Sequence, residues 1–286
     1  GFGLGSFAAG AAAAALLVAQ AVDLGLAATS PLERRLSENF VDRAARRLRS
    51  AAPTVVAITG SFGKTTTKEY ARHLLGGTMH VVASPASFNN RLGLARAINE
   101  GLDAGVQVLI AEMGTYGPGE IAELCRWIPP DIAVMTAVGP VHLERFGSLE
   151  AIARGKAEIL AGARVAVANW DDPLVRGAVE SKSGLQVIRC SAVTAEADVS
   201  VLADGDALVV RVAGEEAGRL PAAGVFPMNV ACAAGIAHAL GVPAARLGER
   251  LAGLPRPQHR GVEGRSEAGV VIIDDTYNSN PAGARA

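Results

Sequence analysis

Residues 57–70, AITGSFGKTTTKEY, place a lysine and three threonines directly after a glycine-containing turn. If a helix begins at Lys64, its backbone N–H groups and the lysine ammonium can bind the phosphates of a nucleotide, and the hydroxyl of Thr65 can reach Mg²⁺. The usual phosphate-binding loop is longer and begins with a further glycine, but Ile58 stands where that glycine belongs. An ordinary capped helix start is the alternative interpretation of so short a match.

Three further side chains have types that suit phosphate or metal chemistry. Glu112 falls at the end of the apolar segment VQVLIAEM, where a carboxylate can hold a hard divalent cation or can serve a helix N-terminus. His142 follows another apolar segment in the same way, although a single histidine is more often structural. Lys156 lies in AIARGKAEIL, a helical pattern in which a lysine is ordinarily a solvated surface charge.

The composition limits the class of protein and its partners. Half of the 286 residues are apolar, the formal net charge is −1 and aromatic residues are scarce, which argues against nucleic acid as a partner. Cys125, Cys190 and Cys232 are odd in number, lie far apart in the sequence and form no Cys-x-x-Cys pair. A disulfide framework or a structural zinc site is therefore not expected, and a reducing, cytosolic compartment is.

Short apolar segments alternate with helical patterns from Thr54 onward. Strands are predicted at 54–59, 106–113, 131–138, 163–169 and 185–190, and helices at 64–75, after Pro118, at 149–160 and from Pro173. This alternation predicts an α/β fold with a doubly wound, mostly parallel sheet of P-loop type, whose ligands bind beyond the carboxyl ends of the strands. An antiparallel hairpin with a Gly205-Asp206 turn is predicted within 198–220, followed by helices at 228–240 and 244–252.

The first 53 residues differ from the rest of the chain. Residues 1–22 carry no charge and include AAGAAAAALLVAQAV, so a membrane-spanning helix is predicted within residues 1–28. Residues 29–53 are rich in arginine and have the pattern of a basic amphipathic helix, which would place the following domain on the cytoplasmic face of the cell membrane. The alternative is an Ala-rich helix buried in a soluble, cytoplasmic fold. The abrupt start at Gly1 also leads us to expect further sequence upstream.

The segment TGSFGKTTTKE closely resembles the ATP-binding loop of the Mur ligases, a family that joins amino acids to the peptidoglycan precursor. The pattern of that family is TGxxGKT, so the short loop is its normal form. Four further stretches resemble the family in the same order between Val55 and Pro281: SFNNRLG, AEMG, GPVHLERFGSLEAIARGKAEI and IDDTYNSNP.

The resemblance implies a site for ATP and Mg²⁺. The implied ATP-binding residues are Thr59, Gly60, Ser61, Phe62, Gly63, Lys64, Thr65, Thr66, Asn229, Arg260 and Asp275. The implied metal ligands are Thr65, Glu112, His142 and Lys156, the last as a carbamate, and the implied catalytic residues are Lys64, Glu112, His142 and Lys156. Asn89 and Asn90 are implied to face a UDP-sugar substrate. From the residues alone, Arg260 can equally be a solvated linker charge and Asp275 a turn-forming aspartate. In the adenine-binding helix start only Asn229 is retained, because Met228 and Cys232 stand at the other two positions.

The reaction that the resemblance implies is ATP-dependent amide-bond formation. ATP would phosphorylate the carboxylate of a UDP-linked muramoyl-peptide, and an amine would then attack the acyl phosphate. The stretches IDDTYNSNP and Phe146-Gly147-Ser148 imply D-alanyl-D-alanine as that amine. The expected domains are an ATP-binding domain at 54–254, a linker at 255–268 and the start of a C-terminal domain at 269–286. Because Mur ligases have three domains, the chain as given is expected to be incomplete for turnover.

Three other functions are compatible with the sequence. A related ligase could act on another carboxylate, as polyglutamate and cyanophycin enzymes do. A membrane-tethered, non-catalytic protein could keep the fold and bind nucleotide weakly. A P-loop kinase is the third alternative, but it gives no reason for the stretch around Lys156.

Overall fold

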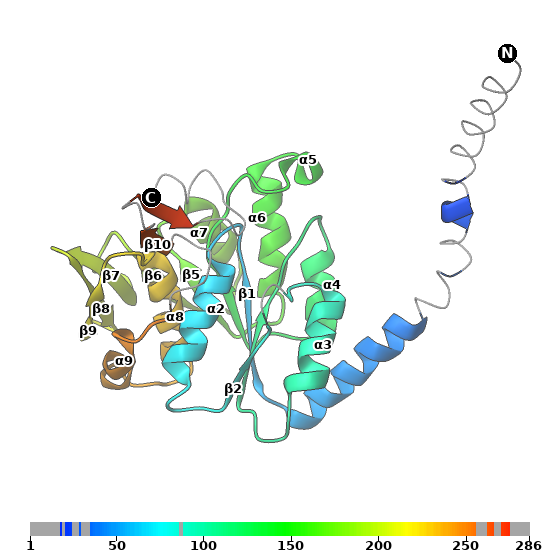
Figure 1. The fold of residues 1–286 in the computed structure, drawn as a ribbon, viewed down its shortest axis with the longest axis horizontal. Helices are drawn as coiled ribbons and strands as arrows, with labels where there is room; N and C mark the ends of the chain where they lie inside the picture. The colour runs from blue at the N-terminus through cyan, green and yellow to red at the C-terminus, as the bar shows by residue number, and fades with distance from the viewer. Residues whose placement is uncertain are drawn as a thin grey trace, which may run out of the picture.

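A nine-stranded sheet, with the order β2-β3-β1-β4-β5-β6-β7-β8-β9, organises the part of the chain that the structure describes (Figure 1). The structure is a computed structural model that describes residues 35–85, 88–255, 262–265 and 270–274, together with residues 18, 21–24 and 29. Neighbouring strands from β2 to β7 pair parallel, and β8 and β9 complete one edge as antiparallel strands.

The strands are short, and the central ones are almost wholly apolar. Their bounds are β1 (Thr54–Thr59), β2 (Val81–Ala83), β3 (Val108–Glu112), β4 (Ile132–Met135), β5 (Val165–Asn169), β6 (Gln186–Ser191), β7 (Val199–Asp204), β8 (Ala207–Val212) and β9 (Glu215–Pro221). Every residue of β3 and β4 is buried. Continuous apolar runs of this kind are typical of parallel strands that helices cover on both faces.

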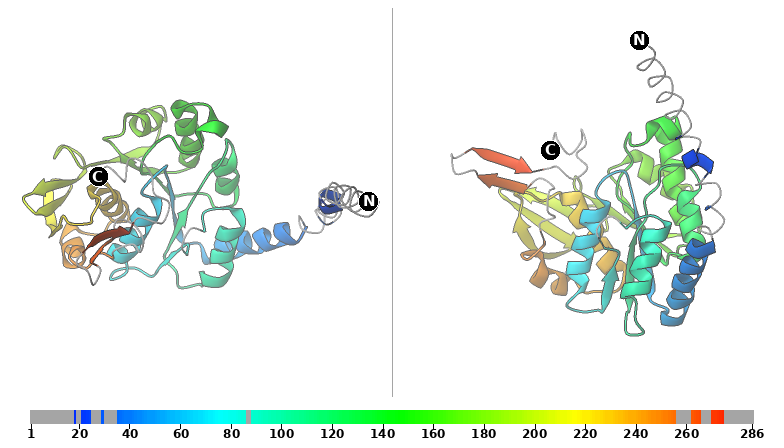
Figure 2. Two further views of the ribbon diagram at one scale, coloured as in Figure 1. Left: turned by 45° about the horizontal axis from the view of Figure 1, so that its top comes forward. Right: turned by 45° about the vertical axis from the view of Figure 1, so that its right-hand side comes forward.

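Two layers of helices cover the sheet, as Figures 1 and 2 show from different directions. One layer consists of α2 (Lys64–Leu75), α8 (Pro227–Ala239) and α9 (Ala244–Leu251). The opposite layer contains α3 (Arg91–Gly101), α4 (Glu120–Trp127), the 3-10 turn η1 (Glu158–Leu160), α7 (Pro173–Glu180) and a helix over residues 35–51. Two further helices, α5 (Leu143–Phe146) and α6 (Leu149–Ala157), lie between β4 and η1 in the chain. The fold is therefore the α/β sandwich that the sequence predicts.

The arginine-rich helix over residues 35–51 packs against the domain along one face. Val41, Ala44 and Leu48 are buried in the same apolar cluster as α3 and α4. Arg47 donates hydrogen bonds to the carbonyl oxygens of Leu102 and, at 2.9 Å, of Asn99. The sequence predicts a basic amphipathic helix here, and the apolar face of that helix adds to the core of the domain.

The predicted membrane helix lies largely outside the described residues, of which 18, 21–24 and 29 are the first. Among the described residues, no helix has the length and apolar character needed to cross a bilayer. The membrane-spanning assignment of residues 1–28 stays a prediction.

Three elements differ from the sequence prediction. Strand β2 and helix α3 were not predicted, and the expected hairpin is a three-stranded antiparallel unit, β7-β8-β9. The predicted turn at Gly205-Asp206 is confirmed, and a second turn at Ala213-Gly214, where both residues have positive φ, joins β8 to β9. Strand β10 (Val262–Arg265) lies within the predicted linker and pairs antiparallel with β11 (Val271–Asp274), which lies within the predicted start of the C-terminal domain.

Candidate nucleotide and metal site

The phosphate-loop sequence forms a tight turn between the carboxyl end of β1 and the first turn of α2. Gly60 has φ 157°, and Gly63 has φ 81°, in the left-handed region that favours glycine. A Cβ atom on Gly60 would lie 2.0 Å from the Thr136 hydroxyl oxygen, and one on Gly63 would lie 2.4 Å from Asn229 Oδ1. Both glycines therefore allow close approach of neighbouring side chains to the loop.

The end of β4 holds this loop in place. The Ser61 N–H donates to the Ala137 carbonyl at 2.8 Å, and the Ser61 hydroxyl donates to the Gly139 carbonyl at 3.0 Å. Thr136 Oγ1 donates to the carbonyl oxygens of Thr59, at 3.2 Å, and of Phe62. Because these bonds join the loop to the residues that follow β4, they fix the loop backbone beside the positive N-terminal end of α2.

Lys64 is the first residue of α2 and folds back over the loop. Its ammonium donates to the Gly60 carbonyl at 2.7 Å. The lysine charge thus lies directly above the turn whose N–H groups are suited to phosphate. This arrangement confirms the sequence prediction of a strand, a short glycine turn and a helix that begins at Lys64.

Glu112 is the last residue of β3 and is 1% exposed. Its Oε2 accepts hydrogen bonds from the Thr65 hydroxyl, at 2.9 Å, and from the Lys68 ammonium, at 3.2 Å. Its Oε1 accepts from the Asn89 side-chain amide at 3.3 Å. The hydroxyl of Thr65 and the carboxylate are adjacent hard oxygen donors at the edge of the phosphate loop, so these two residues fit Mg²⁺.

Lys156 is placed by a corner between α5 and α6. Gly147 ends α5 with φ 80°, and the Ser148 hydroxyl caps α6 by accepting from the Ala151 N–H at 3.1 Å. The Phe146 ring packs over Gly155, where a Cβ atom would lie 2.6 Å from the ring. The Phe146-Gly147-Ser148 run therefore has a structural role, which is to orient the helix that carries Lys156.

The Lys156 amine is buried, with 5% of the residue exposed. Burial, together with repulsion from nearby Lys64, lowers its pKa to about 7. Both effects disfavour the ammonium form of a lysine. The Lys156 amine is therefore sensitive to the charge of Lys64, the first helical residue after the phosphate loop.

His142 is the N-cap residue before α5 and has φ 57°, an uncommon left-handed conformation for a residue with a side chain. Its ring lies 4.7 Å from the ring of Tyr116, centroid to centroid. Among the described residues, no group of three or more His, Cys, Asp or Glu side chains forms a metal cluster. The role of His142 as a ligand therefore stays a prediction, which would need the cation to be shared with nucleotide oxygens.

The predicted substrate asparagines have contacts within the protein. Asn90 caps α3 by accepting from the Gly93 N–H at 2.9 Å, whereas Asn89 bonds to Glu112. Asn229 lies beside Gly63 and the Thr67 hydroxyl, so it contacts the phosphate loop. Cys232, in contrast, is fully buried, with its sulfur 3.8 Å from that of Met228. Arg260 and Asp275 lie outside the described residues.

Two residues with contacts at this site were not singled out from the sequence: Lys68 pairs with Glu112, and Thr136 anchors the phosphate loop. A third residue that was not singled out, Glu158, accepts from the N–H groups of Gly119 and Ala122 at the start of α4. Glu158 belongs to the GKAEI stretch, two residues after Lys156. The position of Glu158 beside a candidate site residue could have identified it from the sequence, whereas nothing in the sequence marks Thr136.

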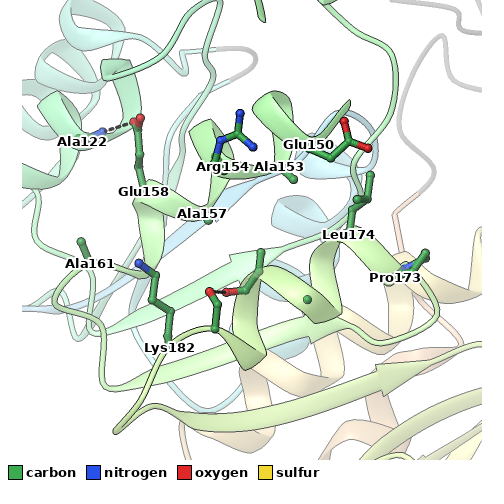
Figure 3. A pocket seen from close by; sticks show the side chains of 13 residues that line it. Ala122, Glu150, Ala153, Arg154, Ala157, Glu158, Ala161, Pro173, Leu174 and Lys182 are labelled. Atoms are coloured by element: carbon green, nitrogen blue, oxygen red, sulfur yellow. Dashed lines mark hydrogen bonds between the residues drawn. The ribbon is translucent and has the colours of Figure 1, made fainter. Parts of the chain in front are cut away.

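A separate groove of about 760 Å³ lies against α6 and α7 (Figure 3). Small residues such as Ala153, Ala157 and Ala178 line it, and Glu158 bonds to Ala122 at one end. None of the phosphate-loop residues belongs to its lining. The groove is therefore distinct from the site built around Lys64 and Glu112.

Comparison with known proteins agrees with this geometry. The model of the Mur ligase middle domain matches residues 58–237. The UDP-N-acetylmuramoyl-tripeptide--D-alanyl-D-alanine ligase of Mycobacterium leprae is 35% identical over 256 residues, which cover 82% of this chain and 49% of that protein. The chain thus spans about half the length of the curated relatives it matches.

Two solved structures are similar over most of the described fold. MurF from Acinetobacter baumannii has a TM-score of 0.77 and 28% identity, covering 87% of this chain and 56% of its own. MurF ligase from Thermotoga maritima, solved in complex with ADP, has a TM-score of 0.74 and 30% identity, covering 87% of this chain and 59% of its own. The chain belongs to the Mur ligase family, and its phosphate loop, Glu112 and Lys156 all lie within the matched middle domain.

Proposed function

We propose that this protein takes part in ATP-dependent amide-bond formation on a peptidoglycan precursor. The observation that carries the proposal is the contact between two predicted site residues at the N-terminal end of α2, where the Thr65 hydroxyl donates to Glu112. Neighbouring Lys64 also lowers the pKa of Lys156, a third predicted metal ligand. Residues 54–254 would form the ATP-binding domain.

In the proposed reaction the substrates supply the reacting groups. A carboxylate oxygen of a UDP-linked muramoyl-peptide attacks the γ-phosphorus of ATP, ADP leaves, and an acyl phosphate forms. The amine of D-alanyl-D-alanine then attacks the acyl carbon, phosphate leaves, and the amine loses a proton. The protein contributes position and charge stabilisation. The similarity to D-alanyl-D-alanine ligases supports this choice of substrates.

Each side chain would have a distinct task. The loop N–H groups and Lys64 hold the β- and γ-phosphates, and Lys64 moves from the Gly60 carbonyl to do so. Thr65 and Glu112 would hold Mg²⁺, with His142 and carbamoylated Lys156 as further predicted ligands. Bound Mg²⁺ supplies positive charge against the transferring phosphoryl group.

The environment of Lys156 supports its assignment as a carbamate. A carbamate forms when a neutral amine adds to CO₂ and loses a proton. Because its pKa is lowered to about 7, Lys156 is neutral in a substantial fraction of molecules near neutral pH. Carbamoylation would replace repulsion between Lys64 and Lys156 by attraction.

The test is substrate-dependent release of ADP from the full-length native protein. We expect ADP release when UDP-linked muramoyl-tripeptide and D-alanyl-D-alanine are both present, with amide product in equal amount. Acceptors of the polyglutamate and cyanophycin type serve as the comparison panel. ADP release only with a polyglutamate- or cyanophycin-type acceptor would instead assign the protein as a related ligase that acts on another carboxylate. Weak nucleotide binding without ADP release in any mixture would favour the non-catalytic protein.

A further inference from the structure

Lys68 is a fully buried cation next to the proposed metal site. It lies on α2, close to one helical turn after Thr65, and its side chain is 0% exposed. The ammonium nitrogen is 3.2 Å from Glu112 Oε2 and 3.9 Å from Glu69 Oε1. Glu69 is partly exposed and also pairs with Arg72, so Glu112 is the buried partner of Lys68.

The Glu112 carboxylate is satisfied by the protein alone. Oε2 accepts from Thr65 and Lys68, and Oε1 accepts from Asn89. A cation that binds Glu112 must therefore compete with hydrogen bonds already made. It must also enter within a few ångströms of a fixed positive charge, in surroundings where charges interact more strongly than in water.

We propose that Lys68 is an internal counter-ion of Glu112, which weakens binding of a free divalent cation until nucleotide phosphates arrive. The inference rests on the proposed nucleotide and metal site and adds the order in which its parts assemble. Phosphate oxygens supply both further ligands and negative charge, which offset the repulsion by Lys68. Magnesium sites built from one carboxylate and substrate phosphates need this contribution, since the protein alone gives few ligands.

The counter-ion also explains how the fold tolerates a buried carboxylate at Glu112. A buried carboxylate without a partner is strongly destabilising, and Lys68 supplies that partner. With Lys68 in place, the domain does not depend on a cation for its stability. If Lys68 is replaced by an apolar residue, the stability of the fold should come to depend on a bound cation.

The test measures Mn²⁺ binding to nucleotide-free full-length protein by the electron paramagnetic resonance signal of unbound Mn²⁺. We expect weak binding by the wild type and at least roughly tenfold tighter binding by Lys68→Met, because a charge a few ångströms from the cation is removed. The matched double variant, Lys68→Met with Glu112→Gln, lacks both charges and should bind as weakly as the wild type. Equal or weaker binding by Lys68→Met than by the wild type would overturn the proposal, as would tight binding by the wild type.

Thermal unfolding with and without MnCl₂ covers the case in which Lys68→Met is unstable. We expect Mn²⁺ to raise its unfolding midpoint more than that of the wild type, or to restore folding if the metal-free variant is unfolded. A variant that stays unfolded with and without Mn²⁺ would show that Lys68 is a structural requirement that no cation replaces, and would contradict the proposal. Mg-ADP affinity of the wild type, measured separately, tests the proposed nucleotide site by itself.

Discussion

The positive charge of Lys64 lowers the pKa of Lys156, although the two residues lie on different helices. Burial of Lys156 and repulsion from Lys64 lower the pKa of Lys156 from its ordinary 10.5 to about 7. The shift links the stability of the domain to pH, since the unfolded chain binds a proton that the folded chain binds less readily.

Stability should therefore rise with pH above 7. Between about 7 and 10.5 the unfolded state keeps the Lys156 proton and the folded state does not, so raising the pH favours folding. From pH 7 to pH 9 this one group contributes roughly 2 kcal/mol to the free energy of unfolding. Urea denaturation in CO₂-free buffer measures it as the difference between wild type and Lys156→Met. The exposed lysine variant Lys182→Met is the matched control and should follow the wild type; identical pH dependence in all three proteins would contradict the shift.

Carbamoylation of Lys156 should follow the same titration. We expect a ¹³C carbamate signal from protein in ¹³C-labelled bicarbonate, which grows as the pH rises through about 7 because the neutral amine becomes more abundant. The signal should be absent in Lys156→Ala and retained in Lys182→Ala. A signal of equal strength in Lys156→Ala would assign the carbamate to another amine.

Alanine substitutions at Gly63 and Gly162 distinguish the effect of backbone strain from the effect of a close side-chain contact. Both have positive φ, 81° and 84°, but a Cβ atom would meet Asn229 at Gly63 and open space at Gly162. Gly162→Ala should lower the free energy of unfolding by about 1–2 kcal/mol and leave ADP affinity unchanged. Gly63→Ala should weaken ADP binding as well, because the loop must move to relieve the contact. Calorimetric titration with Mg-ADP checks both variants, and unchanged affinity in Gly63→Ala would contradict the loop geometry.

Asn90 should matter for stability more than for nucleotide binding. Its side chain caps α3, so Asn90→Ala should cost about 1 kcal/mol in the free energy of unfolding. Asn90→Asp keeps a capping oxygen and should keep most of that stability. Mg-ADP affinity should be the same in both variants and the wild type. If Asn90→Ala unfolds at the same urea concentration as the wild type, the cap contributes nothing.

The core of the fold and the centre of the site were predictable because they depend on local patterns. Apolar runs such as those of β1 and β3 specify buried parallel strands, and the segment from Thr59 to Thr65 specifies a turn and a helix start. Strand ends then meet at one edge, which brings Glu112 to Thr65.

Other features depend on tertiary contacts that no local pattern shows. β2 has three residues, and α3 carries an early glycine, Gly93, that weakens its helical pattern. Lys68 follows three threonines as one lysine among polar residues, and its burial comes from the packing of α2 against β3. Asn89 was assigned to substrate by resemblance, yet its visible partner is Glu112.

Binding of Mg-ATP to Lys64→Ala tests the central claim most directly, because the Lys64 ammonium lies on the phosphate loop and its neighbour Thr65 bonds to Glu112. Isothermal titration should show a loss of about 10- to 100-fold in affinity, the range expected for hydrogen bonds to a charged group, with Lys182→Ala unchanged. Circular dichroism establishes that both variants are folded. Equal Mg-ATP affinity in folded Lys64→Ala and wild type would contradict the assignment of this loop as the nucleotide site.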